Sequence, residues 1–212
     1  MMNRLRNRRL MGVVLGLVMA GSLVLRPDDG NALVIAGPDI IAAPPSVIDD
    51  PPGAVNDHQQ AFDERQSVLL AVALAVDSGF IPAGTLVSSH MIFLNTDGPV
   101  FALDAQIWTF DGIILGVMSD TGGTLEAAST ALLGALGTIY PAAFPNRGLE
   151  GGDSYLLLGN QIALTASVTE PGDWIRVITL ASPVPEPSTL LLLAMSVAGL
   201  AGSTWLRSRR RT

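Results

Sequence analysis

The residue types in this chain that could do chemistry are mainly carboxylates. Glu150 and Asp153 flank a Gly-Gly pair, and Asp173 follows later in the chain. Hard cations such as Ca²⁺ are bound by carboxylate and loop carbonyl oxygens, so these three residues form a candidate calcium cluster. A second candidate group consists of Asp97 with Asp111 or Asp120. No EF-hand spacing or acidic nonapeptide repeat accompanies either group, so ordinary solvated acids are the simpler interpretation, and we expect no resident metal or cofactor.

The serines and histidines form no catalytic pattern. His90 follows Ser88 and Ser89 in an expected strand, where Ser89 and His90 point to opposite faces. The sequence has no G-x-S-x-G nucleophile elbow, no H-E-x-x-H zinc motif and no cysteine, which excludes thiolate chemistry and disulfides. We therefore interpret His90 as a half-buried, hydrogen-bonded residue and His58 as solvated. We expect no catalytic residue and no enzymatic activity.

The charge balance separates the middle of the chain from its ends. Between Leu33 and Ser182 there are 16 Asp or Glu residues against three Arg, a balance of −13, whereas the whole chain carries −7. Nucleic-acid binding is excluded because phosphates would be repelled. Arg147 and Arg176 are expected to pair internally with a carboxylate such as Glu150 or Asp173, with ligand recognition as the alternative.

Short strands joined by tight turns are the elements expected to position these residues. A helix with Thr124 as its N-cap is expected over 124–136, because this segment is rich in Ala and Leu. The pattern predicts an all-β fold over 61–182, an antiparallel β-sandwich or jelly roll with one short helix. The expected strands are 67–76, 84–94, 100–110, 113–118, 154–158, 161–168 and 173–180.

The strand over 100–110 carries the clearest alternation. It places Phe101, Leu103, Ala105 and Ile107 on one face and Asp104 and Gln106 on the other. Asp111-Gly112 then predicts a two-residue hairpin loop to the next strand. The aromatic residues Trp108, Phe110 and Trp174 either pack in the core or form a platform for a sugar. Core packing is favoured because their strands also carry apolar faces.

The N-terminal segment has the layout of a secretory signal peptide over 1–32. Four arginines precede an apolar stretch from Leu10 to Leu25, and Ala32 is the expected last residue before cleavage. An uncleaved N-terminal anchor is the alternative. Residues 33–60 contain five prolines and are predicted to be a linker, either disordered or an extended arm.

The C-terminal segment 183–212 is organised around an uncharged stretch. Residues 189–206 would make a helix of roughly 27 Å, just long enough to span a bilayer core. The basic residues that follow are Arg207, Arg209, Arg210 and Arg211, and the positive-inside rule keeps them in the cytoplasm. A short single-pass anchor is one interpretation, and it places the middle of the chain outside the cytoplasm.

A sharper interpretation comes from the residues before this stretch, Val184, Pro185, Glu186, Pro187, Ser188 and Thr189. Followed by an apolar helix and an arginine cluster, they resemble the PEP-CTERM sorting signal of Gram-negative bacteria. The resemblance covers about residues 183–212. It implies recognition by an exosortase, a membrane cysteine protease or transpeptidase, with cleavage near the motif, so the chain would be the substrate.

Residues 62–180 more loosely resemble a β-rich ectodomain that accompanies this signal in many bacterial proteins and carries no known activity. Together the resemblances imply passage through the inner membrane and a mature domain in the periplasm, at the cell surface or outside the cell. They imply a structural or interaction role, with extracellular polysaccharide as an expected partner. A secreted carbohydrate-binding module and, after it, a hydrolase are the alternatives.

Overall fold

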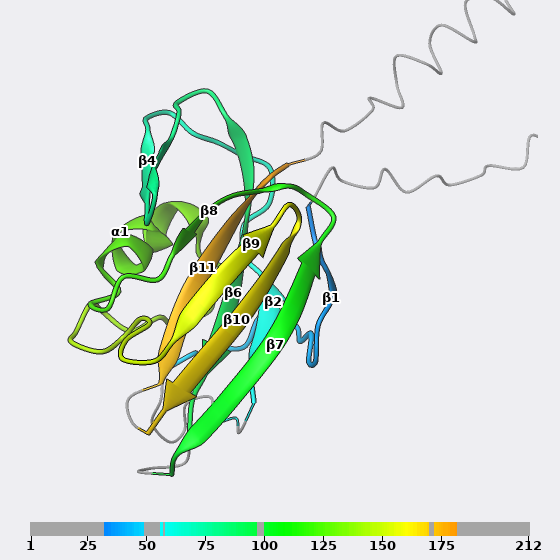
Figure 1. The fold of residues 1–212 in the computed structure, drawn as a ribbon. Coiled ribbons are helices and arrows are strands. Elements are labelled where there is room, and N and C mark those ends of the chain that lie inside the picture. Colours follow the sequence, from blue (N-terminus) through cyan, green and yellow to red (C-terminus); the bar gives the residue numbers. More distant parts are fainter. Residues whose placement is uncertain (1–31, 49–55, 57, 97–99, 170–171, 182–212) are drawn as a thin grey trace, which may run out of the picture.

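Two antiparallel sheets form the body of the protein, shown in Figure 1 as a computed structural model that describes residues 32–48, 56, 58–96, 100–169 and 172–181. The first sheet has the order β1 (Val34–Ala36), β7 (Ala102–Phe110), β10 (Gln161–Val168) and β9 (Ser154–Leu158). The second has the order β2 (Gln60–Asp63), β6 (Leu86–Leu94), β11 (Asp173–Leu180) and β8 (Ile114–Met118), with β3 (Val68–Leu69) also paired to β6. Strands β4 (Leu74–Val76) and β5 (Gly79–Ile81) form a separate hairpin. The predicted mostly-β fold with antiparallel sheets is confirmed.

The core between the sheets is built from the inward faces of both. Trp108 and Phe110 of β7 pack in one cluster with Ile92 of β6 and with Ile175 and Val177 of β11. All five side chains are buried. The preference for core packing of Trp108 and Phe110 is therefore confirmed, and these two rings offer no surface to a ligand.

The second sheet is covered on its outer face as well, which explains why β6 and β11 are buried along almost their whole length. Trp174 packs there against Phe144, and its indole Nε1 donates to the carbonyl of Val47 (2.7 Å). The helix α1 (Thr124–Leu133) covers the same face, at the side of β8 and β11 (Figure 1). The helix prediction is confirmed, although α1 ends at Leu133.

The cap of α1 differs from the predicted one. Gly123 occupies the N-cap position, and the carboxylate of Asp120 accepts hydrogen bonds from the backbone N–H groups of Thr124 (2.8 Å) and Leu125 (2.9 Å). Thr124 is therefore the first helical residue and not the cap, because a carboxylate four residues earlier in the chain satisfies its N–H group.

The proline-rich segment is not a free linker in its described part. Val34 to Ala36 pair with β7, and Val47 is completely buried. Backbone N–H groups of Ile41 and Val47 donate to the carbonyls of Ala61 and Ile139, both at 2.9 Å. The prolines prevent long strands here, but single bridges and isolated buried side chains still fix the segment to the sandwich. Ala32 belongs to this packed part: it is buried, and its N–H donates to Ser88 Oγ (3.3 Å).

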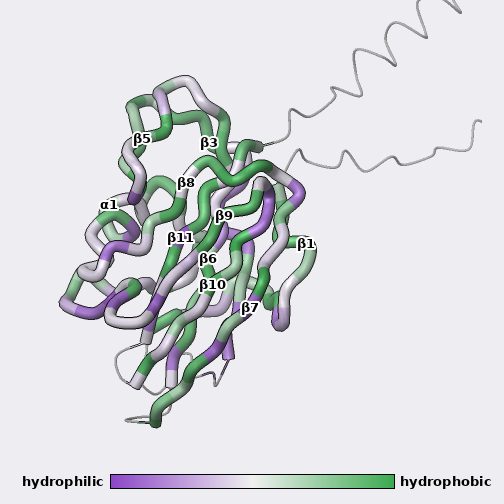
Figure 2. Tube along the Cα trace, viewed as in Figure 1, coloured by the Kyte–Doolittle hydropathy of each residue, from purple (hydrophilic) through white to green (hydrophobic). Residues whose placement is uncertain are grey.

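The alternation predicted for β7 is confirmed, and the face that carries Asp104 and Gln106 is the inward one. Figure 2 shows hydrophobic and hydrophilic residues alternating along this strand. Leu103 and Ile107 are 63% and 59% exposed, whereas Asp104 points inward. Its carboxylate accepts from the N–H of Gln59 (2.7 Å), and Gln59 in turn accepts from the indole of Trp108 (2.9 Å). A buried polar network thus decides the orientation of the first half of β7.

The predicted Asp111-Gly112 hairpin is wrong, because β7 and β8 lie in different sheets. The pair is a crossover that passes close to the end of β11. A Cβ atom on Gly112 would lie 2.5 Å from the carbonyl oxygen of Leu180, so only glycine fits there. By contrast, the predicted bounds of β9, β10 and β11 are confirmed, and β9 and β10 pair directly. The single strand expected over 67–76 is divided into β3 and β4.

Within the part of the chain that the structure describes, no helix has the length and apolar character needed to cross a bilayer. The expected signal peptide up to residue 31 and the expected membrane helix 189–206 lie outside the described residues.

Candidate metal centre

Three carboxylates meet at one end of the sandwich, and they are the three that the sequence singled out. Glu150 and Asp153 belong to the turn that precedes β9, and Asp173 is the first residue of β11. One carboxylate oxygen of each residue lies within 4.8 Å of the corresponding oxygens of the other two. Among the described residues, no other three His, Cys, Asp or Glu side chains gather in this way.

The turn is held by its own hydrogen bonds. The N–H of Asp153 donates to the carbonyl of Glu150 (2.9 Å), and the N–H of Glu150 donates to Asp153 Oδ2 (3.0 Å). Asp153 Oδ1 accepts from both the N–H (2.8 Å) and the hydroxyl (2.7 Å) of Ser167 on β10. Asp153 is therefore fixed to the first sheet, opposite a residue of the second.

Asp173 is the least satisfied of the three. It is 3% exposed, and its Oδ2 is buried without a hydrogen-bond partner, as is Oε2 of Glu150. Asp173 lies on the same face of β11 as Ile175 and Val177, which is the face toward the sandwich core. It borders a small cavity that is otherwise lined mainly by apolar residues. Buried carboxylate oxygens normally accept hydrogen bonds, so this environment is costly for a charge.

The electrostatics agree with that geometry. Burial, together with the negative charges of Asp153 and Glu150, raises the pKa of Asp173 to about 9. Burial, followed by the charge of Asp153, also raises the pKa of Glu150. Two carboxylates about 5 Å apart repel by about 3 kcal/mol at an effective dielectric constant of 20. No Arg or His of the described chain forms an ion pair with any of the three. The cluster is relieved only by a proton or a cation.

The second candidate group is not brought together in the described structure. Asp97 lies outside the described residues. Asp111 accepts a hydrogen bond from the N–H of Leu33 (2.6 Å), and Asp120 caps α1. Although burial acts to raise the pKa of Asp120, its hydrogen bonds with Thr124 and Leu125 outweigh that effect and lower the pKa. The carboxylates of Asp111 and Asp120 therefore accept hydrogen bonds from backbone N–H groups and do not form a shared metal site in the described structure.

Arg176 pairs internally, as predicted, but with a partner that the sequence did not reveal. It is completely buried and makes two hydrogen bonds to Glu64, from Nε to Oε2 (2.6 Å) and from Nη2 to Oε1 (2.7 Å). Its Nη1 donates to the carbonyl of Glu126 (2.6 Å) and to Ser129 Oγ (2.7 Å) on α1. The expected partners Glu150 and Asp173 are wrong.

Arg147 completes a second buried pair with Glu126, whose carboxylate also lies 3.0 Å from Nη2 of Arg176. Burial lowers the pKa of Arg147 to about 10, and the nearby charge of Arg176 contributes to the same shift. Two arginines and two glutamates thus balance one another between α1 and the second sheet. This network is structural, because all four side chains are buried.

His90 belongs to an arrangement that resembles a hydrolase triad in its hydrogen bonds. Its Nδ1 is 2.7 Å from Asp63 Oδ1, and its Nε2 is 3.0 Å from Thr179 Oγ1. His90 and Thr179 are both 0% exposed, so no substrate reaches the hydroxyl. The histidine is hydrogen-bonded, as predicted, but completely and not half buried. Ser89 instead donates to Glu64 (2.6 Å), from the other face of β6.

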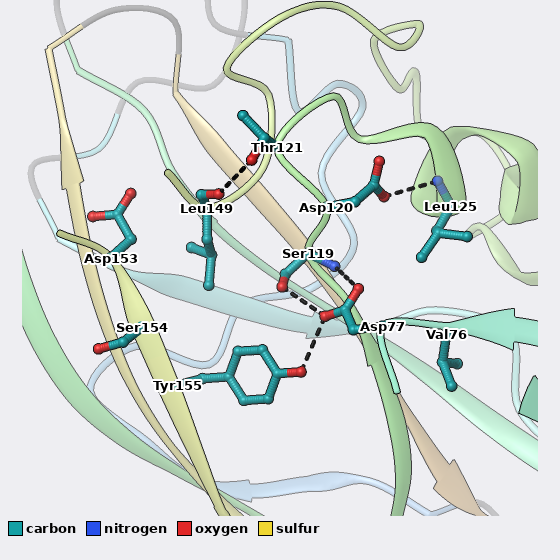
Figure 3. Close-up of a pocket in the computed structure, with 10 residues that line it drawn as sticks. All are labelled: Val76, Asp77, Ser119, Asp120, Thr121, Leu125, Leu149, Asp153, Ser154 and Tyr155. Atoms are coloured by element: carbon teal, nitrogen blue, oxygen red, sulfur yellow. Dashed lines mark hydrogen bonds between the residues drawn. The ribbon is translucent and has the colours of Figure 1, made fainter. Parts of the chain in front are cut away.

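A pocket of about 500 Å³ adjoins the carboxylate cluster through Asp153 (Figure 3). Asp77 accepts hydrogen bonds there from the N–H (3.0 Å) and hydroxyl (2.7 Å) of Ser119 and from the hydroxyl of Tyr155 (3.1 Å). Burial, together with the charge of Asp77, raises the pKa of Tyr155 to about 12. No local sequence pattern indicates this pocket, because its residues come from five separate segments of the chain.

Comparison with known proteins yields one match. A family model for the PEP-CTERM protein-sorting motif matches residues 183–211. No curated protein and no solved structure matches the chain. The matched segment, including Val184 to Ser188 and the four terminal arginines, lies outside the described residues.

Proposed function

Because residues 183–211 carry the PEP-CTERM protein-sorting motif, we propose that this chain is an exported exosortase substrate whose β-sandwich is the delivered part. The motif is the observation that carries the proposal. Proteins with this motif are recognised by an exosortase and are held in the membrane during transit, so the sandwich is exposed outside the cytoplasm.

The segments have distinct roles in this proposal. The signal peptide 1–32 starts export, and residues 189–206 hold the chain in the inner membrane while Arg207, Arg209, Arg210 and Arg211 remain in the cytoplasm. The exosortase reads Val184 to Ser188 and cuts near them. The sandwich then reaches the periplasm, the cell surface or the surrounding matrix.

For the delivered domain we propose a structural or interaction role without catalysis. The buried Thr179–His90–Asp63 arrangement supports this, because a nucleophile without access cannot meet a substrate. Carbohydrate binding is the second candidate, favoured by the pocket that Asp77 and Tyr155 line. Glycan-array binding of the purified full chain, lost in Tyr155→Phe and Asp77→Asn, would support this second role.

The sorting proposal is tested by intact mass spectrometry of the protein recovered from an exosortase-bearing Gram-negative host. The wild-type chain is expected to lose the segment that follows the motif. Replacing Pro185, Glu186 and Pro187 by alanine is expected to leave Thr212 in place, because the recognition residues are gone while the apolar stretch is unchanged.

A matched control keeps the charge of the tail. Arg209→Lys with Arg210→Lys preserves the positive residues that orient the membrane segment, so processing is expected to continue. If both the wild type and the triple-alanine variant end at Thr212, the chain is not processed and the segment is a plain anchor.

A further inference from the structure

We propose that Glu150, Asp153 and Asp173 bind one calcium ion at the end of the sandwich where β11 begins. This site goes beyond export and processing, because it concerns what the delivered domain holds. Its ligands come from the turn before β9 and from the first residue of β11. An ion there links the first sheet to the second.

The distances fit one coordination shell. Calcium binds oxygens at about 2.4 Å, so two ligands on opposite sides of the ion are about 4.8 Å apart. The three carboxylate oxygens all lie within 4.8 Å of one another, so each can contact the same ion. Carbonyls of the turn and waters complete the six to eight oxygens that calcium takes.

A second observation points to a missing ligand. Asp173 is only 3% exposed, its Oδ2 is buried without a hydrogen-bond partner, and its carboxylate contributes one oxygen to the three-residue cluster. The other deeply buried glutamates have cationic partners: Glu64 receives donors on both oxygens from Arg176 and Ser89, and Glu126 pairs with Arg147. A buried carboxylate oxygen that the described chain leaves without a donor is the arrangement expected of a cation ligand.

Arg147 is close to the cluster in the sequence, but its side chain does not pair with the three carboxylates. Arg147 precedes Glu150 by three residues, and its carbonyl accepts from the N–H of Trp174, next to Asp173. Its guanidinium is nevertheless turned to Glu126. The cluster therefore keeps three carboxylates without a protein cation among the described residues, which suits a divalent ion.

The donor set selects the type of cation. All three side-chain ligands are carboxylates, and no His or Cys joins them, so softer metals such as zinc are disfavoured. Calcium accepts irregular shells that mix carboxylates with loop carbonyls, whereas magnesium requires near-ideal octahedral geometry and retains most of its waters. The irregular turn at Glu150 to Asp153 favours calcium.

The test uses the full chain in detergent, freed of metal with EDTA and then melted at increasing calcium concentration. We expect Tm to rise by about 5–10 °C at 10 mM calcium, which is the shift that a Kd of about 0.1–1 mM gives. Asp173→Asn and Glu150→Gln are expected to lose the shift. Asp173→Asn should melt no lower than the wild type in EDTA, because the amide is neutral at a site that disfavours a charged carboxylate, so the lost shift does not reflect misfolding.

Asp111→Asn is the matched control. Asp111 is an exposed carboxylate near the other end of β11, roughly 23 Å away at 3.3 Å per residue, and it should retain the full shift. Isothermal titration should give one site for the wild type. The proposal is overturned by no shift at 10 mM calcium, by an equal shift in Asp173→Asn and Glu150→Gln, or by an equal shift with magnesium.

Discussion

The buried pair between Arg176 and Glu64 gives the sharpest stability prediction. Both side chains are completely buried, and they share two hydrogen bonds of 2.6 and 2.7 Å. Replacing Arg176 by methionine removes the guanidinium and keeps a long apolar chain in its place. Glu64 then retains only the hydroxyls of Ser89 and Tyr140, and the Glu126 carbonyl loses one of its donors.

The magnitude follows from leaving a buried charge without its partner. Removing one member of a buried ion pair costs about 3–5 kcal/mol. For a domain of this size, each kcal/mol shifts Tm by about 3–5 °C, so Arg176→Met is expected to lower Tm by about 10–20 °C. The double variant Glu64→Gln with Arg176→Met should recover at least about half of the loss, because its side chains carry no charge into the interior.

Urea unfolding followed by circular dichroism measures these differences, and Arg65→Met is the control. Arg65 is half-buried and forms no ion pair with any described residue, so its replacement should cost less than about 1 kcal/mol. The reasoning is refuted if Arg176→Met falls within 1 kcal/mol of this control, or if the double variant is no more stable than Arg176→Met alone.

Two further changes test the ends of elements. Asp120→Ala should destabilise by about 1 kcal/mol at pH 7 because it removes the acceptor for Thr124 and Leu125. Since the folded protein lowers the pKa of Asp120, this contribution is present above the ordinary Asp pKa and is lost as pH falls through the lowered value. Unfolding curves of variant and wild type should therefore converge in acid, and a constant difference would contradict the capping role. Gly112→Ala should cost more than about 2 kcal/mol in urea unfolding, because its Cβ would lie 2.5 Å from the Leu180 carbonyl; an unchanged midpoint would contradict this close approach.

The sequence was sufficient for strands whose ends carry turn residues. Strands β9, β10 and β11 have the predicted bounds, because Gly159-Asn160 and Glu170-Pro171-Gly172 interrupt the alternation between them. The alternation of β7 was also predicted, but alternation defines two faces and does not say which one is inward. The answer depended on Gln59, which lies 45 residues before Asp104 and satisfies it inside the sandwich.

Pairing across the chain was the part that local patterns could not supply. Glu64 lies 112 residues from Arg176, and nothing near either residue indicates the other. The packing of the proline-rich segment against the sandwich could not be predicted, for a related reason. Its composition argues against long strands, yet the burial of Val47 depends on Trp174, a residue at the far end of the domain.

The sequence was sufficient to group Glu150, Asp153 and Asp173, but it did not indicate that they lack a cationic partner. The positions of the basic residues in the fold explain why they lack one. Arg147 forms an ion pair with Glu126, and Arg176 forms one with Glu64. His58 lies against Asp39, and His90 lies against Asp63. Residues 33–182 contain 16 acidic residues and only three arginines, and two of these, Arg147 and Arg176, are paired in the buried network with Glu126 and Glu64. The fold places the guanidinium groups of Arg147 and Arg176 on the face of the second sheet that holds α1. The carboxylates where β11 meets the turn before β9 therefore form no ion pair with a described Arg or His. The positive charge that offsets the repulsion among these three carboxylates near neutral pH therefore has to come from the solvent. Replacing Asp173 by asparagine should make the stability of the domain independent of that added charge.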